Sequence, residues 1–205
     1  MFVEKGRNIE VLNGYFQSLH YFHPEYENVI RRIFTPLPAL QLMASALLEK
    51  AAGEIPYEDR IFIGIHVRHG MDVTWNSRNL RHGHTAATAD YFRKAMDHFR
   101  QRFRGRTLRF IVASDNYPWA RMNIEEKAIG EVTFLPNDIY REVDLAALLL
   151  CNHTITSTGT FSWWSGYLTG GQVTRFSGWP RPGSPMAQMV DVKEYFPDDW
   201  IAIDG

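Results

Sequence analysis

The chain has 205 residues, of which 45% are hydrophobic and 22% are charged. This length suits one ordinary domain or two unequal ones, and the composition is typical of a folded globular protein and not of a disordered one. Because 22 Lys and Arg residues balance 23 Asp and Glu residues, giving a net charge of −1, nothing in the composition indicates nucleic acid or an anionic membrane surface as a partner. The single cysteine excludes an internal disulfide and a cysteine-based zinc cage.

The first sixty residues differ in character from the rest. Val11 to Phe16 predicts a short strand and turn. Residues 24–52 predict two helical pieces, divided at Thr35-Pro36-Leu37-Pro38 because proline breaks helical hydrogen bonding. No stretch approaches the roughly 18 apolar residues of a transmembrane helix, so we expect membrane contact only through a segment that this sequence lacks. The abrupt start, with a predicted strand and no lead-in, favours an N-terminal truncation.

From Arg60 onward, apolar runs of strand length alternate with helical patterns. Strands are expected at 61–67, 108–113, 132–135, 153–157 and 172–176, a polar loop at 70–87, and helices at 88–103, 117–127, 142–151 and 161–169. Strands separated by helices predict an α/β fold, with a Rossmann-like parallel sheet and flanking helices. In such sheets ligands bind beyond the carboxyl ends of the strands.

Polar residues follow three of the predicted strands, at 66–68, 114–116 and 157–160. Phosphates are bound well by arginine, by free backbone N–H groups and by helix N-termini. Arg68 and the turn from Ser157 to Ser162 offer these groups, and so predict a diphosphate site. Plainer interpretations stay open: a surface ion pair for Arg68 and a simple helix cap for the turn.

The letters Arg-His-Gly at 68–70 allow a second interpretation. Histidine phosphatases begin with such a motif after a strand, and His69 would then accept the phosphate. Such an enzyme needs a second histidine beside the first, and the motif usually opens the domain. Here it lies about a third of the way along the chain, and His82 and His84 stand in the adjacent loop. These features weigh against a phosphatase.

Three longer segments resemble a known family. DLAALLLCNHTITSTGTFSWWSGYLTGG (144–171) is similar to the C-terminal signature of the α-1,2-fucosyltransferases. IFIGIHVRHG (61–70) resembles their strand and His-Val-Arg-Arg-Gly-Asp motif, and IVASDNYPWARMNI (111–124) resembles their Ser-Asn/Asp helix entry. The resemblance implies a GT-B-like enzyme, in which residues 60–205 form the Rossmann-like GDP-fucose-binding half. Residues 1–59 would be the mostly helical end of the acceptor-side part.

The resemblance implies transfer of L-fucose from GDP-fucose to the 2-hydroxyl of a galactoside, with inversion of the anomeric centre. No cofactor and no metal are expected, because the chain has no Asp-x-Asp clamp and the family needs none. The implied partners are GDP-fucose and a galactose-terminated glycan, with no nucleic acid. For a complete eukaryotic protein the implied location is the lumenal side of the Golgi membrane.

The family's functional residues carry over to matching positions of this sequence. His66 and Arg68 match the donor-binding and catalytic motif, in which Arg68 would stabilise the leaving β-phosphate. Asp144 matches a nucleoside contact, although it also suits the dipole of the helix that it opens. Asp115 is a further candidate for the nucleoside. The turn that would cradle the diphosphate and fucose comprises Thr158, Gly159, Thr160, Phe161 and Ser162.

The sequence departs from the family at two positions of the first motif. His69 stands where the family has a second arginine, and Met71 stands where it has aspartate. Asp72 lies one place later, and serves as the base for the acceptor hydroxyl only if the loop shifts. Loss of one positive charge should weaken neutralisation of the diphosphate unless His69 is protonated. An inactive relative that binds nucleotide-sugar or glycan therefore stays open.

Overall fold

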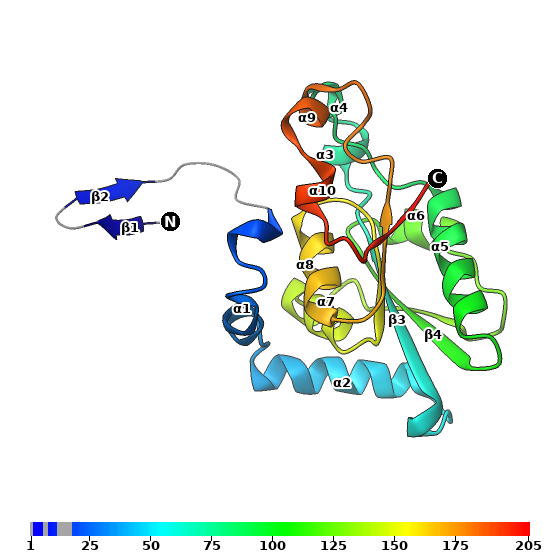
Figure 1. Ribbon diagram of the computed structural model, residues 1–205. Coiled ribbons are helices and arrows are strands. Elements are labelled where there is room, and N and C mark those ends of the chain that lie inside the picture. The colour runs from blue at the N-terminus through cyan, green and yellow to red at the C-terminus, as the bar shows by residue number, and fades with distance from the viewer. Residues whose placement is uncertain (1, 6–7, 12–17) are drawn as a thin grey trace.

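The computed structural model describes residues 2–5, 8–11 and 18–205. Its main body is an α/β structure, in which a six-stranded parallel sheet carries helices on both faces (Figure 1). The strand order is β5-β4-β3-β6-β7-β8. The strands are β3 (Arg60–Val67), β4 (Thr107–Ser114), β5 (Val132–Phe134), β6 (His153–Thr156), β7 (Val173–Phe176) and β8 (Ile201–Ile203). The predicted fold class is confirmed.

The helices in the described part of the chain follow the predicted alternation. They are α1 (Glu27–Ile33), α2 (Pro38–Ala52), α3 (Met71–Thr74), α4 (Ser77–His82), α5 (Ala89–Arg102), α6 (Tyr117–Asn123), α7 (Arg141–Leu149), α8 (Thr160–Thr169), α9 (Pro185–Met189) and α10 (Val192–Tyr195). Two short 3-10 helices, η1 (Leu19–Tyr21) and η2 (Tyr57–Asp59), complete the set.

Alternate residues of the central strands face two separate hydrophobic clusters, as the two-residue period of a strand requires. Ile63 and Ile65 of β3 contribute to the larger cluster, which also contains the buried face of α5. Phe62 contributes to the smaller cluster on the opposite face, with α2 and α7. A side chain at Gly64 would lie 2.9 Å from Leu148 of α7, so this glycine allows α7 to pack closely on the sheet.

The structure differs from the predicted elements in several places, among them the unpredicted helices α9 and α10. The predicted loop at 70–87 contains α3 and α4, because Asn76 accepts hydrogen bonds from Arg78 N and Asn79 N and so caps α4. Helix α6 ends at Asn123, four residues earlier than predicted. Strand β8, which was not predicted, pairs with β7 at the edge of the sheet.

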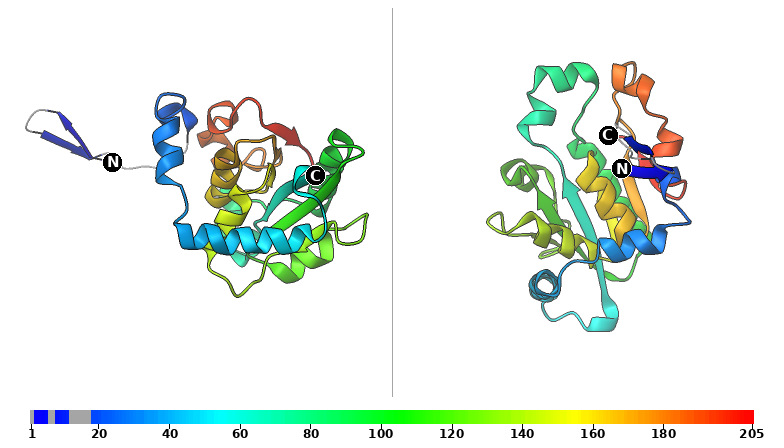
Figure 2. Two further views of the ribbon diagram at one scale, coloured as in Figure 1. Left: turned by 90° about the horizontal axis from the view of Figure 1, so that it is seen from below. Right: turned by 90° about the vertical axis from the view of Figure 1, so that its left-hand side faces the viewer.

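The N-terminal part divides into two helices at the proline-containing segment, as predicted. Helix α2 packs against α7 through buried Ala44, Leu48 and Ala52. It lies along the main body in the left view of Figure 2 and is seen end-on in the right view. Val11 ends β2 (Asn8–Val11), which pairs antiparallel with β1 (Phe2–Lys5). The rest of the strand and turn predicted at 11–16 lies outside the described residues. The domain boundary at residue 60 stays a prediction.

Candidate functional site

A cleft of about 830 Å³ lies beyond the carboxyl ends of β3, β4 and β6. This size falls within the range of ligand pockets, roughly 300–1,000 Å³. We call it the strand-end cleft. It is lined by His66, Arg68, Asp72, Val73, His84, Ala113, Ser114, Asp115, Asn116, Tyr117, Pro118, Asn137, Ile139, Arg141, Asp144, Thr158, Gly159, Thr160 and Phe161. Every residue that the sequence predicted for the site lines this cleft except Ser162.

Arg68 extends from the end of β3 and connects two strand ends. Its backbone N–H donates to the Ser157 hydroxyl at 2.9 Å, which ties the end of β3 to the turn after β6. Its guanidinium pairs with two carboxylates, those of Asp72 and Asp115. The plainer interpretation of Arg68 as an ion-paired residue therefore describes the contacts seen, although the residue also lines the strand-end cleft.

Asp115 supports the backbone of the loop that follows β3. Besides the Arg68 guanidinium, its carboxylate accepts hydrogen bonds from His69 N at 2.7 Å and Gly70 N at 3.1 Å. A side chain at Gly70 would come within 2.6 Å of the same carboxylate, so glycine permits this close approach. The contacts give Asp115 a supporting position at the site, between the arginine and the loop.

The turn after β6 leads directly into α8. Gly159 occupies the N-cap position with φ of +86°, a conformation that residues with side chains rarely adopt. The Ser162 hydroxyl accepts a hydrogen bond from Ser157 N at 2.7 Å and is buried, so Ser162 stabilises the turn from within. The first residues of α8 line the cleft, and bring to it the positive end of the helix dipole.

Four buried polar atoms in the strand-end cleft have no hydrogen-bond partner. They are His66 Nδ1, Tyr117 Oη, Asp144 Oδ1 and Thr158 Oγ1. Buried polar groups in proteins are nearly always hydrogen-bonded, and those that are not require an explanation. A bound polar ligand that supplies the missing partners is the simplest one.

Burial also shifts the pKa values of His66 and Asp144. It lowers the pKa of His66 to about 4, so the imidazole is neutral near pH 7. The ring packs against Phe161, with 4.6 Å between ring centroids. Burial raises the pKa of Asp144 to about 7, because the ionised carboxylate is poorly solvated there. Shifted pKa values of this kind concentrate at functional sites.

Neither of the two departures from the family motif lines the strand-end cleft. His69 stacks on Trp119 with ring centroids 3.9 Å apart, and it does not line the strand-end cleft. Burial lowers the pKa of His69, which disfavours the protonated form that would replace the missing arginine charge. Met71 is exposed, whereas Asp72 lines the cleft from the first turn of α3. The aspartate thus reaches the cleft although it comes one place late in the sequence.

Several residues of the cleft were not predicted from the sequence. Arg141 lies three positions before Asp144 in α7, a spacing that places both on one helix face and could have indicated it. Tyr117 opens α6, and burial, with the nearby Asp144 carboxylate, raises its pKa. His84 comes from the loop after α4, for which the sequence gives no comparable signal.

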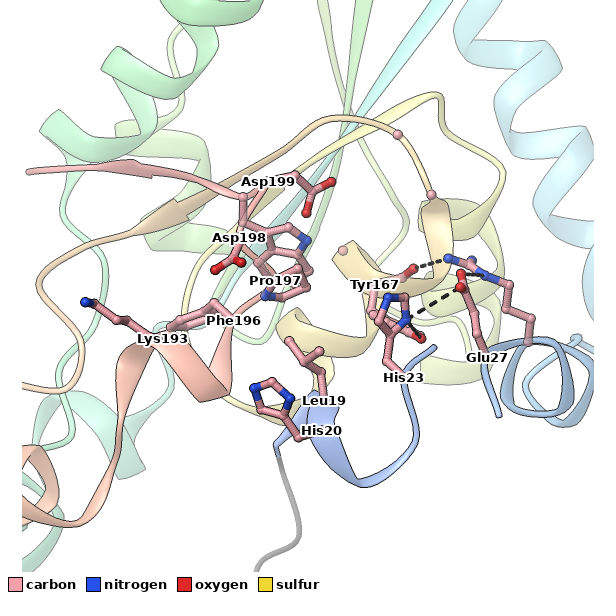
Figure 3. Close-up of a pocket in the computed structure, with 15 residues that line it drawn as sticks. Leu19, His20, His23, Glu27, Tyr167, Lys193, Phe196, Pro197, Asp198 and Asp199 are labelled. Carbon is pink, nitrogen blue, oxygen red and sulfur yellow. Dashed lines mark hydrogen bonds and ion pairs between the residues drawn. The ribbon is translucent and has the colours of Figure 1, made fainter. Parts of the chain in front are cut away.

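A second cavity, of about 510 Å³, lies between the segment 19–31, the end of α8 and the segment 193–200. We call it the terminal cavity; Figure 3 shows its residues. Four of its polar side chains, those of His23, Glu27, Arg31 and Tyr167, are bonded to one another or to backbone carbonyls. His23 Nδ1 lies 3.1 Å from the Tyr167 hydroxyl, and Glu27 pairs with Arg31 at 2.8 Å. Arg31 also donates to the carbonyls of Tyr167 and Leu168.

The described residues contain neither a metal-binding cluster nor a membrane-spanning helix. Among residues 2–5, 8–11 and 18–205, no group of three or more His, Cys, Asp or Glu side chains is arranged to hold a metal ion. None of the helices in these ranges is both long enough and apolar enough to cross a membrane.

Comparison with known proteins gives one consistent family. The model of glycosyl transferase family 11 matches residues 6–204. The chain is 31% identical to human galactoside alpha-(1,2)-fucosyltransferase 1 over 202 residues, which cover 95% of this chain and 52% of that protein. It is 34% identical to pig galactoside alpha-(1,2)-fucosyltransferase 2 over 146 residues, 70% of this chain and 42% of that protein.

The chain thus spans about half the length of these relatives or less. No solved structure matches it significantly. The family match covers nearly the whole chain, including all the residues that line the strand-end cleft. The chain belongs to glycosyl transferase family 11.

Proposed function

We propose that the chain transfers L-fucose from GDP-fucose to the 2-hydroxyl of a galactose-terminated glycan. Membership of glycosyl transferase family 11 and likeness to proteins named galactoside alpha-(1,2)-fucosyltransferases support this function. The observation that carries it is the strand-end cleft, where an arginine, a helix N-terminus and four unpartnered polar atoms meet. This is the set of groups that a nucleotide diphosphate requires.

In this proposal the donor lies along the strand-end cleft. Its diphosphate contacts Arg68 and the N-terminus of α8, where backbone N–H groups and the helix dipole favour negative charge. Its nucleoside contacts Asp144, whose unpartnered oxygen accepts hydrogen bonds from the base. The neutral His66 imidazole and the Thr158 hydroxyl contact the fucose and the β-phosphate.

The transfer itself is an inverting displacement. The acceptor 2-oxygen attacks the anomeric carbon of fucose, and the bond to the β-phosphate oxygen breaks with its electron pair staying on GDP. Arg68 and the α8 N-terminus stabilise the charge that develops on the phosphate, so the proposal assigns no role to a metal ion. A carboxylate accepts the proton of the acceptor hydroxyl, and Asp72 lies at the cleft for this purpose.

The proposed cellular location follows from the proposed transferase function. In a eukaryotic cell the enzyme would act on the lumenal side of the Golgi membrane, held there by a segment other than the described helices.

A second function has one specific observation in its favour. Arg68 is paired with two carboxylates, and His69 replaces the family's second arginine without lining the cleft. A chain with this arrangement could bind GDP-fucose or glycan without transferring the sugar. The phosphatase interpretation lacks such support, because His69 would have to face the cleft in order to accept phosphate.

One experiment separates these functions. The protein is incubated with GDP-fucose and a galactoside, with and without EDTA, and in parallel with a phosphomonoester. We expect fucose transfer that persists in EDTA and is lost in the Arg68→Ala variant. Donor binding without transfer would establish the second function. Phosphate release that depends on His69 would overturn the proposal in favour of a phosphatase.

A further inference from the structure

We propose that Asp72 becomes the base for the acceptor hydroxyl only when the donor diphosphate displaces it from Arg68. Binding of the donor then also releases the Asp72 carboxylate from Arg68. The acceptor can react only after the donor has bound. The inference rests on the proposed function and concerns the same strand-end cleft. It is carried by the contacts of Arg68, Asp72 and Asp115.

Both outer nitrogens of the Arg68 guanidinium are engaged by carboxylates. Nη1 contacts Asp115 Oδ2 and Nη2 contacts Asp72 Oδ2. One positive charge thus faces two negative charges at the place where a diphosphate must bind. A diphosphate adds further negative charge, so it cannot share the guanidinium with both carboxylates without strong repulsion. One carboxylate has to leave.

The two carboxylates are held unequally, and this decides which one leaves. Asp115 keeps two backbone hydrogen bonds, from His69 N and Gly70 N, when the guanidinium turns to a phosphate. The Asp72 carboxylate pairs with Arg68 through one of its oxygens. The Asp72 side chain is 47% exposed, against 27% for Asp115, so water readily solvates it after release. Asp72 is therefore the carboxylate that gives way.

The other charged and titratable groups at the strand-end cleft do not take over this role. His66 is buried, and its lowered pKa makes it a weak base. His84 also has a lowered pKa, caused first by burial. Asp144 and Arg141 lie at the end of the cleft formed by α7, where the proposed function places the nucleoside. Asp72 is the carboxylate that borders Arg68 and also gains freedom when Arg68 binds phosphate.

In the reaction, the freed Asp72 carboxylate accepts the proton of the acceptor 2-hydroxyl. The new bond joins that oxygen to the anomeric carbon, and the electron pair of the broken bond goes to the β-phosphate of GDP. Arg68 stabilises this charge through the contacts it previously made with Asp72. Asp115 acts as a positioning residue, since it holds the loop backbone and orients Arg68 throughout.

The test measures affinity for the leaving group in variants of the two carboxylates. If Asp72 competes with phosphate for Arg68, Asp72→Asn tightens the binding of both GDP and inorganic pyrophosphate, by about three- to tenfold. The same variant lowers kcat by at least about a hundredfold, since general base catalysis contributes 10²–10⁴. Asp115→Asn weakens the binding of both ligands, because Arg68 and the loop lose their support.

Asp90→Asn is the matched control. Asp90 is also an aspartate paired with a nearby arginine, Arg93, but it lies on α5 and does not line the strand-end cleft. We expect no change in GDP or pyrophosphate affinity for this variant. Thermal melting and circular dichroism establish that each variant is folded, and Asp72→Ala replaces Asp72→Asn if the latter is not.

The outcomes separate the inference from the proposed function. Unchanged or weaker pyrophosphate binding in folded Asp72→Asn, with GDP binding intact in the unaltered protein, overturns the displacement of Asp72 and leaves the transferase proposal standing. Failure of the unaltered protein to bind either GDP or pyrophosphate overturns both. Tighter binding of both ligands with unchanged kcat shows displacement without a role as base, and so overturns the catalytic assignment of Asp72.

Discussion

The terminal cavity and the strand-end cleft differ in how their polar groups are satisfied. In the terminal cavity, the side chains of His23, Glu27, Arg31 and Tyr167 bond to one another or to backbone carbonyls. In the strand-end cleft, buried atoms of His66, Asp144 and Thr158 have no partner. Unsatisfied buried polar groups cost stability. The terminal cavity therefore joins parts of the fold, whereas the strand-end cleft has the unpartnered groups expected of the proposed ligand site.

The terminal cavity has a structural explanation of its own. Its hydrogen bonds connect the segment before α2 to the end of α8, residues more than a hundred positions apart. Phe34 also stacks on Trp164, with 4.5 Å between ring centroids. Substitutions in the two cavities should consequently affect different properties. Changes in the strand-end cleft should alter binding and catalysis, and changes in the terminal cavity should lower the stability of the fold.

The largest expected difference comes from removing an arginine from each cavity. Arg68→Ala should reduce kcat/KM for fucose transfer by about 10²–10³-fold, the usual loss when a group that stabilises transition-state charge is removed. Its melting temperature should change little, since partly exposed ion pairs contribute about 0–1 kcal/mol.

Arg31→Ala is the matched variant in the terminal cavity. It removes hydrogen bonds to Glu27 and to two carbonyls of α8, so the protein should be less stable by about 1–2 kcal/mol. Its kcat/KM should stay near that of the unaltered protein. Thermal melting and initial-rate assays check both variants, and a large loss of activity in Arg31→Ala would contradict the comparison.

The pH dependence of donor binding should reveal the ionisation of the Asp144 carboxyl group. Its pKa lies near 7, and the ionised carboxylate accepts hydrogen bonds from the nucleoside more strongly than the protonated form does. GDP affinity should therefore fall as pH decreases below about 7, by up to tenfold per pH unit. Isothermal titration between pH 5.5 and pH 8 (about the range where the group titrates) measures this, and Asp144→Asn should flatten the dependence. A steep profile in Asp144→Asn would exclude this carboxylate as the source.

Removing one carboxylate from each cavity should shift stability in opposite directions. The folded-state pKa of Asp144 is raised, so the folded protein loses stability as pH rises toward about 7, and above it the loss is complete. Asp144→Asn should then raise the melting temperature at pH 8, while weakening GDP binding. The gain should disappear near pH 4.

Glu27→Gln should instead lower the melting temperature, because Glu27 pairs with Arg31 and His23. Its GDP affinity should not change. Calorimetry at pH 8 and at pH 4 distinguishes the two variants. If both variants lowered the melting temperature equally at pH 8, then burial of the ionised Asp144 carboxylate would not destabilise the folded protein.

The smallest expected effect is that of Tyr167→Phe. This change removes the hydroxyl that bonds to His23 Nδ1 at 3.1 Å and leaves the ring stacked on Trp163. A loss of about 1 kcal/mol is expected, which lowers the melting temperature by about 2–4 °C. GDP affinity should be unaffected, and altered affinity would indicate that the terminal cavity communicates with the cleft.

The sequence predicted the parallel sheet well, because buried strands such as Ile61–Val67 are continuous apolar runs and their ends carry polar residues. It also placed most of the candidate residues together, since the carboxyl ends of parallel strands meet at one edge. Strand β8 has only three residues and was not predicted. Short edge strands give little periodic signal.

Other features depend on tertiary contacts that no local pattern records. The pairing of Arg68 with Asp115 joins residues 47 positions apart, and the bond between His23 and Tyr167 spans 144 positions. Ser162 matched the family motif, but its hydroxyl is used inside the turn. A motif thus indicates which residues gather at a site, whereas the contacts decide what each one does there.

Hydrogen–deuterium exchange with and without GDP tests the central claim most directly. Slower exchange is expected at the amides of 68–70 and 157–162, two segments that contribute residues to the strand-end cleft, and unchanged exchange at 19–31 and 193–200, which contribute residues to the terminal cavity. Arg68→Ala should abolish the protection. Protection confined to the terminal cavity, or none at saturating GDP, would contradict the assignment of the strand-end cleft as the donor site.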